Sequence, residues 1–206
     1  MYKEKDEDVL VKIVLLGDAA VGKTSLRRRW MGERFEGQYL MTIGADFSVK
    51  SMNINFGGKS ISFKFQVWDL AGQVRFQVVR EGYYKGAHGA ILMYDITNVE
   101  SYQNVPNWVG ELWNNSGRGV TPFVLVGNKI DLRNEIPKTI RFEYGSKYAA
   151  KLTKVTVSYG FEVPFLETSA KTGENVDQAF HLLGEMIVEY LETLEKKIKC
   201  QNDYIS

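Results

Sequence analysis

The stretch VKIVLLGDAAVGKTSLRRRW, from Val11 to Trp30, joins an apolar run, a glycine-containing loop and a polar helical pattern. The apolar run Val11–Leu16 is typical of a buried strand, and Ser25–Trp30 is typical of the start of a helix. Between them, GDAAVGKT at Gly17–Thr24 fits the pattern G-x-x-x-x-G-K-[ST]. Because this pattern forms a phosphate-binding loop when it lies between a strand and a helix, the stretch predicts an α/β fold that binds a nucleotide.

Each residue type in this loop suits the binding of phosphate. Gly17 and Gly22 lack Cβ atoms, so backbone N–H groups can surround phosphate oxygens. The N-terminus of the following helix favours negative charge, and Lys23 adds a positive charge near the β- and γ-phosphates. The Thr24 hydroxyl is a hard oxygen ligand of the kind that Mg²⁺ prefers. The loop alone predicts a nucleoside triphosphate with Mg²⁺ and leaves the base open.

A second apolar run, in FVLVGNKID at Phe123–Asp131, ends in residues suited to guanine. The Asp131 carboxylate can accept hydrogen bonds from guanine N1–H and the 2-amino group, whereas adenine would leave this carboxylate unpaired, at a cost of about 1–3 kcal/mol. The Lys129 stem can lie on the base, and Asn128 can connect this loop to the phosphate loop. The alternative for NKID alone is a turn after a strand. Its occurrence together with the phosphate loop favours a guanine nucleotide.

A third string, WDLAGQ at Trp68–Gln73, also follows a strand-like pattern. Asp69 can hold Mg²⁺ through water, and Gly72 can bring a backbone N–H to the γ-phosphate. Gln73 is placed to orient an attacking water molecule, as in small GTPases. The alternative, a simple turn after a strand, is disfavoured because the other two strings are present.

These strings resemble those of the Ras superfamily of small GTPases, most closely its Rab and Ran branches, from about Val9 to Leu194. The acidic tail of Ran is missing, so the Rab branch is favoured. The resemblance implies a molecular switch that binds GTP or GDP with Mg²⁺ and hydrolyses GTP to GDP and phosphate. It also implies effector, exchange-factor and GTPase-activating partners, and a role in membrane trafficking.

The resemblance extends to individual positions of this sequence. Thr42 corresponds to the switch I threonine that closes on Mg²⁺ and the γ-phosphate, and Phe35 to the aromatic residue beside guanine. Ser169-Ala170-Lys171 corresponds to the loop whose alanine N–H faces guanine O6. The expected catalytic residues are Gln73, Lys23 and Thr42; the Mg²⁺ ligands are Thr24, Thr42 and Asp69; and the nucleotide-binding residues are Asp18, Ala19, Ala20, Val21, Gly22, Lys23, Thr24, Ser25, Phe35, Tyr39, Thr42, Gly72, Asn128, Lys129, Asp131, Ser169, Ala170 and Lys171.

Several shorter strings resemble Rab proteins, among them IGADF at Ile43–Phe47 and MYDIT at Met93–Thr97. Phe47, Trp68 and Tyr83 match the three aromatic residues through which Rab proteins contact effectors. Ordinary packing between a switch and the sheet is an equal alternative for these three residues.

The phosphate loop departs from the family pattern at Ala19 and Ala20, where glycine or serine-glycine is usual. A side chain at Ala19 can crowd the transition state, so we expect slow hydrolysis. A nucleotide-bound scaffold with little hydrolysis is therefore kept as an alternative, although Thr42, Asp69 and Gln73 are all present. A small-molecule kinase would need an arginine-rich lid, which no segment supplies.

The alternation of strand-like and helical patterns predicts a doubly wound α/β fold: a six-stranded, mostly parallel sheet with one antiparallel strand and helices on both faces. The antiparallel strand comes from a hairpin of Phe47–Ile54 and Ile61–Trp68. We expect an N-terminal extension (1–8), a small GTPase domain (9–194) and a C-terminal tail (195–206). The predicted strands are Lys12–Leu16, Phe47–Ile54, Ile61–Trp68, Ala90–Asp95, Phe123–Gly127 and Phe165–Thr168.

Composition limits the other classes of function. A formal net charge of +1 disfavours a nucleic-acid binder, and RRR at Arg27–Arg29 is interpreted as a solvated helix face. Cys200 is the only cysteine, which favours a reducing compartment. The following QNDYIS is not a standard prenylation signal. We expect a cytoplasmic monomer, with any membrane association through a partner.

Overall fold

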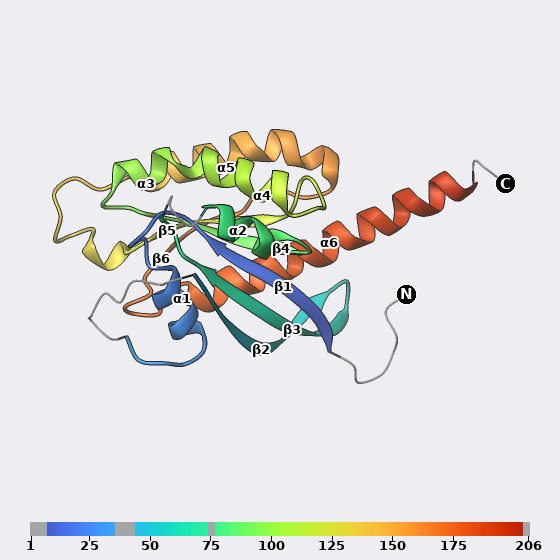
Figure 1. Cartoon of the computed structure of the whole chain (residues 1–206), viewed down its shortest axis with the longest axis horizontal. Coiled ribbons are helices and arrows are strands. Elements are labelled where there is room, and N and C mark those ends of the chain that lie inside the picture. Colours follow the sequence, from blue (N-terminus) through green and yellow to red (C-terminus); the bar gives the residue numbers. More distant parts are fainter. Residues whose placement is uncertain (1–7, 36–43, 74–76, 204–206) are drawn as a thin grey trace.

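A mixed β-sheet forms the middle layer of the computed structural model, which describes residues 8–35, 44–73 and 77–203 (Figure 1). Within these ranges, six strands lie in the order β2-β3-β1-β4-β5-β6. Only β2 and β3 pair in the antiparallel sense, and the other neighbouring strands are parallel. The strands are β1 (Val9–Leu16), β2 (Ala45–Phe56), β3 (Lys59–Leu70), β4 (Gly89–Asp95), β5 (Phe123–Asn128) and β6 (Phe165–Thr168).

Helices cover both faces of this sheet (Figure 1). One face carries α1 and α6, which contact each other as well as the strands. The opposite face carries α3, α4 and α5, with α2 packed against α4. The helices are α1 (Lys23–Trp30), α2 (Gln77–Tyr84), α3 (Val99–Gln103), α4 (Val105–Asn115), α5 (Phe142–Thr156) and α6 (Val176–Asp203), with the short 3₁₀ helices η2 (Ile130–Leu132) and η3 (Val157–Tyr159).

This architecture confirms the predicted fold class. Each predicted strand overlaps an observed one, and the hairpin turns at Gly57–Gly58, with Phe56 paired to Lys59. The central strands are continuous apolar runs because both of their faces are covered, and every residue of β4 is buried.

Aromatic packing holds α1 and α6 together below the sheet. The Trp30 ring stacks on the Phe180 ring with 3.9 Å between centroids, and both side chains are buried. Beyond this contact, α6 runs on to Asp203, past Leu194, where the predicted GTPase domain ends. The division of the chain into an extension, a domain and a tail stays a prediction.

The parallel strands bring their carboxyl ends to one edge of the sheet, and the loops that follow β1, β3, β4 and β5 meet there. In open α/β sheets this edge is the usual place for a ligand. In the part of the chain that the structure describes, no helix is long and apolar enough to cross a membrane.

Candidate functional site

The loop after β1 is shaped by glycine at its end. Gly22 has a φ angle of +102°, in the left-handed region, and α1 begins at the next residue. A Cβ atom at Gly22 would lie only 2.3 Å from the side-chain nitrogen of Asn128, so a larger residue would separate the phosphate loop from the base loop. Ala20 also adopts a left-handed φ angle of +65°, which is strained for alanine.

Lys23 lies across this loop. Its ammonium donates to the carbonyl oxygens of Gly17 at 2.7 Å and Asp18 at 2.8 Å. Burial lowers the pKa of Lys23 to about 8, while the carboxylates of Asp69 and Asp18 act in the opposite direction. These two hydrogen bonds hold the Lys23 ammonium inside the loop that is predicted to bind phosphate.

Thr24 and Asp69 meet beside the lysine. The Thr24 hydroxyl donates to Oδ2 of Asp69, and the buried Oδ1 of the same carboxylate has no hydrogen-bond partner among the residues that the structure describes. Burial raises the pKa of Asp69, an effect that the Thr24 hydrogen bond and the Lys23 charge reduce. A buried carboxylate oxygen without a partner, next to a hydroxyl, is a donor set that fits Mg²⁺. Among the described residues, no group of three or more His, Cys, Asp or Glu side chains could hold a metal ion.

The loop after β3 lies directly on the phosphate loop. A Cβ atom at Gly72 would approach the backbone of Asp18, Ala19 and Gly17 within 2.4–2.5 Å, which only glycine permits. Gln73 follows, partly exposed, at the end of this described segment. The structure thus brings Asp69 and Gly72 into contact with the phosphate loop, and Gln73 is the next residue of the chain.

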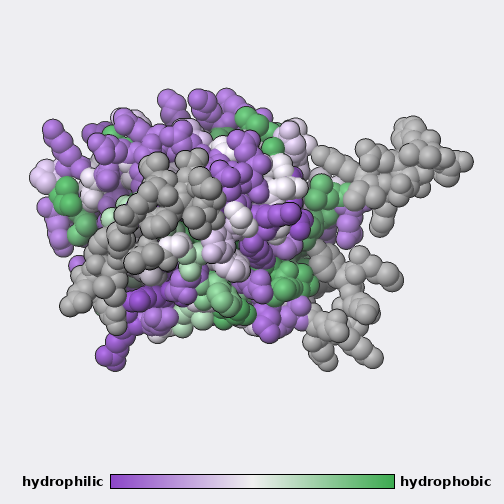
Figure 2. All heavy atoms as spheres, viewed as in Figure 1, coloured by the Kyte–Doolittle hydropathy of each residue, from purple (hydrophilic) through white to green (hydrophobic). Residues whose placement is uncertain are grey.

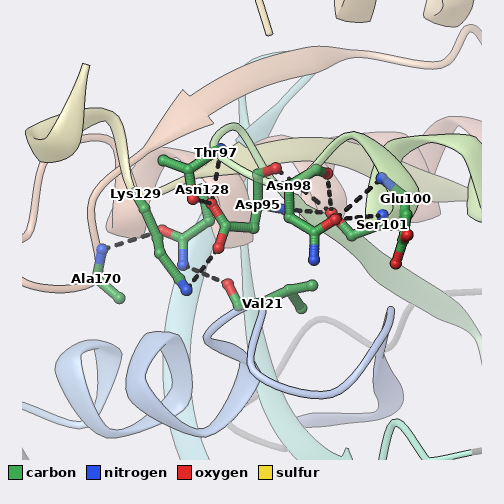
Figure 3. A network of polar contacts seen from close by, with 9 residues as sticks. All are labelled: Val21, Asp95, Thr97, Asn98, Glu100, Ser101, Asn128, Lys129 and Ala170. Carbon is green, nitrogen blue, oxygen red and sulfur yellow. Dashed lines mark hydrogen bonds and ion pairs between the residues drawn. The ribbon is translucent and has the colours of Figure 1, made fainter. Parts of the chain in front are cut away.

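Asn128 connects three elements at the base side of the site (Figure 3). Its Nδ2 donates to Val21 O at 2.8 Å, and its Oδ1 accepts from Thr168 Oγ1 at 3.0 Å and Ala170 N at 3.2 Å. This buried amide fixes the distance between the phosphate loop, β5 and the loop after β6. In this arrangement the Ala170 N–H, which was expected to face guanine, lies against Asn128.

The other base-loop residues are also held by neighbours. Asp131 accepts a hydrogen bond of 2.6 Å from Ser169 Oγ, and the Lys171 ammonium lies 3.8 Å from its carboxylate. Lys129 has a left-handed φ angle of +72°, and its ammonium pairs with Asp95 Oδ2 at 2.6 Å (Figure 3). The base loop is therefore preorganised by ion pairs and hydrogen bonds.

Two arginines of α1 correct the interpretation of Arg27–Arg29 as a solvated face, which was wrong. Arg27 is buried and pairs with Asp46 at the start of β2 at 2.6 Å. Arg29 donates to the carbonyl oxygens of Ala170, at 3.2 Å, and Lys171. The helix after the phosphate loop thus contacts both the start of β2 and the expected base loop.

For the other predicted site residues that it describes, the structure gives a position in the chain. Phe35 lies at the end of a described segment with 42% of its surface exposed, and Ser25 lies in the first turn of α1. Tyr39 and Thr42 lie outside the described residues.

The aromatic trio forms one surface cluster. Trp68 lies between Phe47 and Tyr83, with 5.3 Å between ring centroids on each side, and Phe47 is 56% exposed. Figure 2 shows hydrophobic residues over the region of β2 and β3.

Sequence reasoning missed several residues that support the site. Asp95 lies in MYDIT, a string that served only to compare families, and Trp108 lies in α4; each contacts a loop of the site. The only local signal for Asp95 was its polar character at the end of a predicted strand, and the sequence predicted no role for Trp108.

Comparison of the sequence with those of known proteins points to the same kind of site. The family model described as "Ras family" matches residues 12–189. Ras-related protein SEC4 of Candida albicans (strain WO-1) is 41% identical over 182 residues, covering 88% of this chain and 79% of the relative. GTP-binding protein ypt1 of Schizosaccharomyces pombe is 38% identical over 182 residues, covering 88% and 82%. Ras-related protein Rab-1D of Dictyostelium discoideum is 38% identical over 199 residues, covering 97% and 90%.

These matches confirm the resemblance stated from the sequence motifs, including its Rab-like character. The chain belongs to the Ras family of small GTP-binding proteins.

Proposed function

We propose that this chain is a molecular switch that binds GTP or GDP with Mg²⁺ and slowly hydrolyses GTP to GDP and phosphate. The observation that carries the proposal is the convergence of three loops at one sheet edge. Gly72 abuts the backbone of the phosphate loop, and Asn128 joins that loop to the base loop at 2.8 Å.

Base recognition rests on Asp131 and its neighbours. The Asp131 carboxylate is held by Ser169 and would accept two hydrogen bonds from guanine, while the Lys129 stem would lie along the base. The Ala170 N–H would turn from Asn128 to guanine O6. Exchange of guanine for adenine would leave the Asp131 carboxylate without donors, which is the basis of selectivity.

The phosphates would bind over Lys23 and the N-terminus of α1. Lys23 would exchange its contacts with the Gly17 and Asp18 carbonyls for phosphate oxygens, which gives its positive charge a full counter-ion. Thr24 and Asp69 would hold Mg²⁺ together with Thr42, which lies outside the described residues. When bound, Mg²⁺ neutralises charge on the β- and γ-phosphates.

Hydrolysis needs a water molecule in line with the γ-phosphate, and Gln73 would orient it. The water oxygen bonds to the γ-phosphorus while the bond from that phosphorus to the β–γ bridging oxygen breaks, and a water proton passes to the phosphate that leaves with GDP. The Ala19 side chain would crowd this transition state, so we expect an intrinsic rate on the order of 10⁻⁴ to 10⁻² per second that a GTPase-activating protein would raise.

Loss of the γ-phosphate would release the segments around Thr42 and Gln73, and effectors would read that change. The cluster of Phe47, Trp68 and Tyr83 is the proposed effector surface, because Phe47 is exposed and its ring stacks on that of Trp68. On the basis of the resemblance to Rab proteins, we propose that this switch acts in membrane trafficking.

The test is single-turnover hydrolysis of bound GTP, followed by chromatography of the released nucleotide, beside Gln73→Leu. We expect slow conversion to GDP in the natural chain and a loss of at least about a hundredfold in the variant, with GTP still bound. Equal turnover in both proteins would contradict the role of Gln73.

The alternative is a nucleotide-bound scaffold with little hydrolysis. The alanines at positions 19 and 20 are the observation that favours it, because a side chain there disfavours the transition state. In the same assay this alternative predicts tightly bound GTP that persists in both proteins.

A further inference from the structure

Arg80 of α2 is one of the most completely buried charged side chains in the described chain, with 3% of its surface exposed. Its guanidinium forms two hydrogen bonds to the Glu111 carboxylate of α4, at 2.9 and 3.1 Å. The Tyr84 hydroxyl donates to the same carboxylate at 2.8 Å. A buried charge is costly unless it is fully paired, and here both partners of the ion pair have further contacts.

The third nitrogen of this guanidinium, Nη1, reaches the loop that precedes α2. Arg80 Nη1 donates to the carbonyl oxygens of Ala71 at 2.9 Å and Gln73 at 2.7 Å. These two carbonyls flank Gly72, whose backbone abuts the phosphate loop. One planar group therefore holds the backbone on both sides of Gly72, including that of Gln73.

The same guanidinium contacts the phosphate loop through an aromatic ring. It stacks over Trp108, 4.5 Å from the ring centroid, and Trp108 Nε1 donates to Asp18 Oδ1 at 2.7 Å. Asn104 Nδ2 donates to the other oxygen of Asp18, at 2.8 Å. Arg80 is also close enough to Lys23 to contribute to lowering its pKa.

A merely structural contact between α2 and α4 would need only Arg80 and Glu111. The observed network adds two bonds to the loop of Gln73 and an indole contact to the phosphate loop. Asp18, Gly72, Arg80, Trp108 and Glu111 also line one groove, so the network borders the space beside the phosphate loop.

We propose that Arg80, clamped by Glu111 and Trp108, is a positioning residue for GTP hydrolysis that sets the place of Gln73 relative to the phosphate loop. This inference rests on the proposed function. It assigns to α2 and α4 a part in the reaction without any contact between Arg80 and the nucleotide.

The experiment compares single-turnover hydrolysis of bound GTP with GDP dissociation in Arg80→Gln, in Arg80→Lys and in the natural chain. Arg80→Lys keeps the charge for Glu111 but loses the planar fork that serves a carboxylate and two carbonyls together. It serves as the second variant because it is the more conservative change. We expect hydrolysis to fall about ten- to a hundredfold in both variants, the cost of a displaced reacting group. GDP dissociation should stay within about twofold, because the nucleotide contacts themselves are intact.

Two further variants make the test specific. Glu81→Gln, an exposed carboxylate on α2, is the matched control and should hydrolyse GTP at the natural rate. The double variant Gln73→Leu with Arg80→Lys should hydrolyse GTP no more slowly than Gln73→Leu alone, because Arg80 acts through Gln73.

The possible outcomes separate this inference from the proposed function. If the natural chain does not hydrolyse GTP, the proposed function fails first. If it does and Arg80→Lys hydrolyses at the same rate, or if hydrolysis and GDP retention fall together, the positioning role is wrong and the network only holds α2 to α4.

Discussion

At the scale of single residues, Ala20 is the most strained point of the phosphate loop. Its φ angle of +65° lies in the left-handed region, where an L-amino acid with a Cβ costs about 1–2 kcal/mol relative to glycine. Ala20→Gly removes that strain but makes the unfolded chain more flexible. We expect a net rise of about 0.5–1 kcal/mol in the free energy of unfolding, measured by denaturant titration of the nucleotide-free protein.

Ala19→Gly is the matched control for this strain. Ala19 is equally exposed and is not among the residues with a positive φ angle, so glycine brings only the entropic cost of the unfolded chain. We expect this variant to lose about 0.5–1 kcal/mol. Shifts of the same sign at both positions would contradict the strain at Ala20.

At the scale of elements, an ion pair connects the end of β4 to the residue that follows β5. Asp95 Oδ1 accepts from Thr97 N at 2.8 Å and Oγ1 at 2.7 Å, while Oδ2 pairs with Lys129 at 2.6 Å. Asp95→Asn can keep the Oδ1 contacts and lose the ion pair. Because Lys129 is then free to leave the base, we expect GDP to dissociate about tenfold faster, equivalent to about 1.4 kcal/mol.

Displacement of a fluorescent GDP analogue measures this rate. Glu100→Gln, an exposed change in the neighbouring helix α3, should release the analogue as the natural chain does. An unchanged rate in Asp95→Asn would mean that the ion pair has no effect on nucleotide retention.

How far this site could be predicted depends on the distance along the chain between its parts. The motif residues of the phosphate loop, such as Lys23 and Thr24, lie within eight positions, so spacing alone predicted them. Arg29 reaches Ala170 across 141 positions, and Trp108 reaches Asp18 across 90. No local sequence pattern predicts such contacts, because they depend on how the helices pack on the sheet.

At the scale of the whole molecule, the order of the strands explains why the loops meet. Connections that cross back to the starting end of the sheet make β1, β3, β4 and β5 parallel, so their carboxyl ends share one edge. The apolar runs predicted β4 and β5 because every residue of these two strands is buried. The packing of α5 was not predictable, because it depends on one small residue facing two rings of the sheet.

The last prediction concerns this packing between layers. A Cβ atom at Gly145 of α5 would lie 2.2 Å from the Phe165 ring of β6 and 2.6 Å from the Tyr94 hydroxyl of β4. We expect Gly145→Ala to push α5 off the sheet, so that overpacking outweighs the gain in helix propensity and the free energy of unfolding falls by about 1–2 kcal/mol.

Gly110→Ala is the control, because Gly110 is also a helix residue and a Cβ atom there would meet nothing within 4 Å. Helix propensity alone then raises the free energy of unfolding by about 0.5–1 kcal/mol. Denaturant titrations of the two variants should therefore shift in opposite directions. If both alanine variants are stabilised, α5 can move away from the sheet at Gly145 without a loss of stability. The close contact of Gly145 with Phe165 and Tyr94 would then not determine the position of α5.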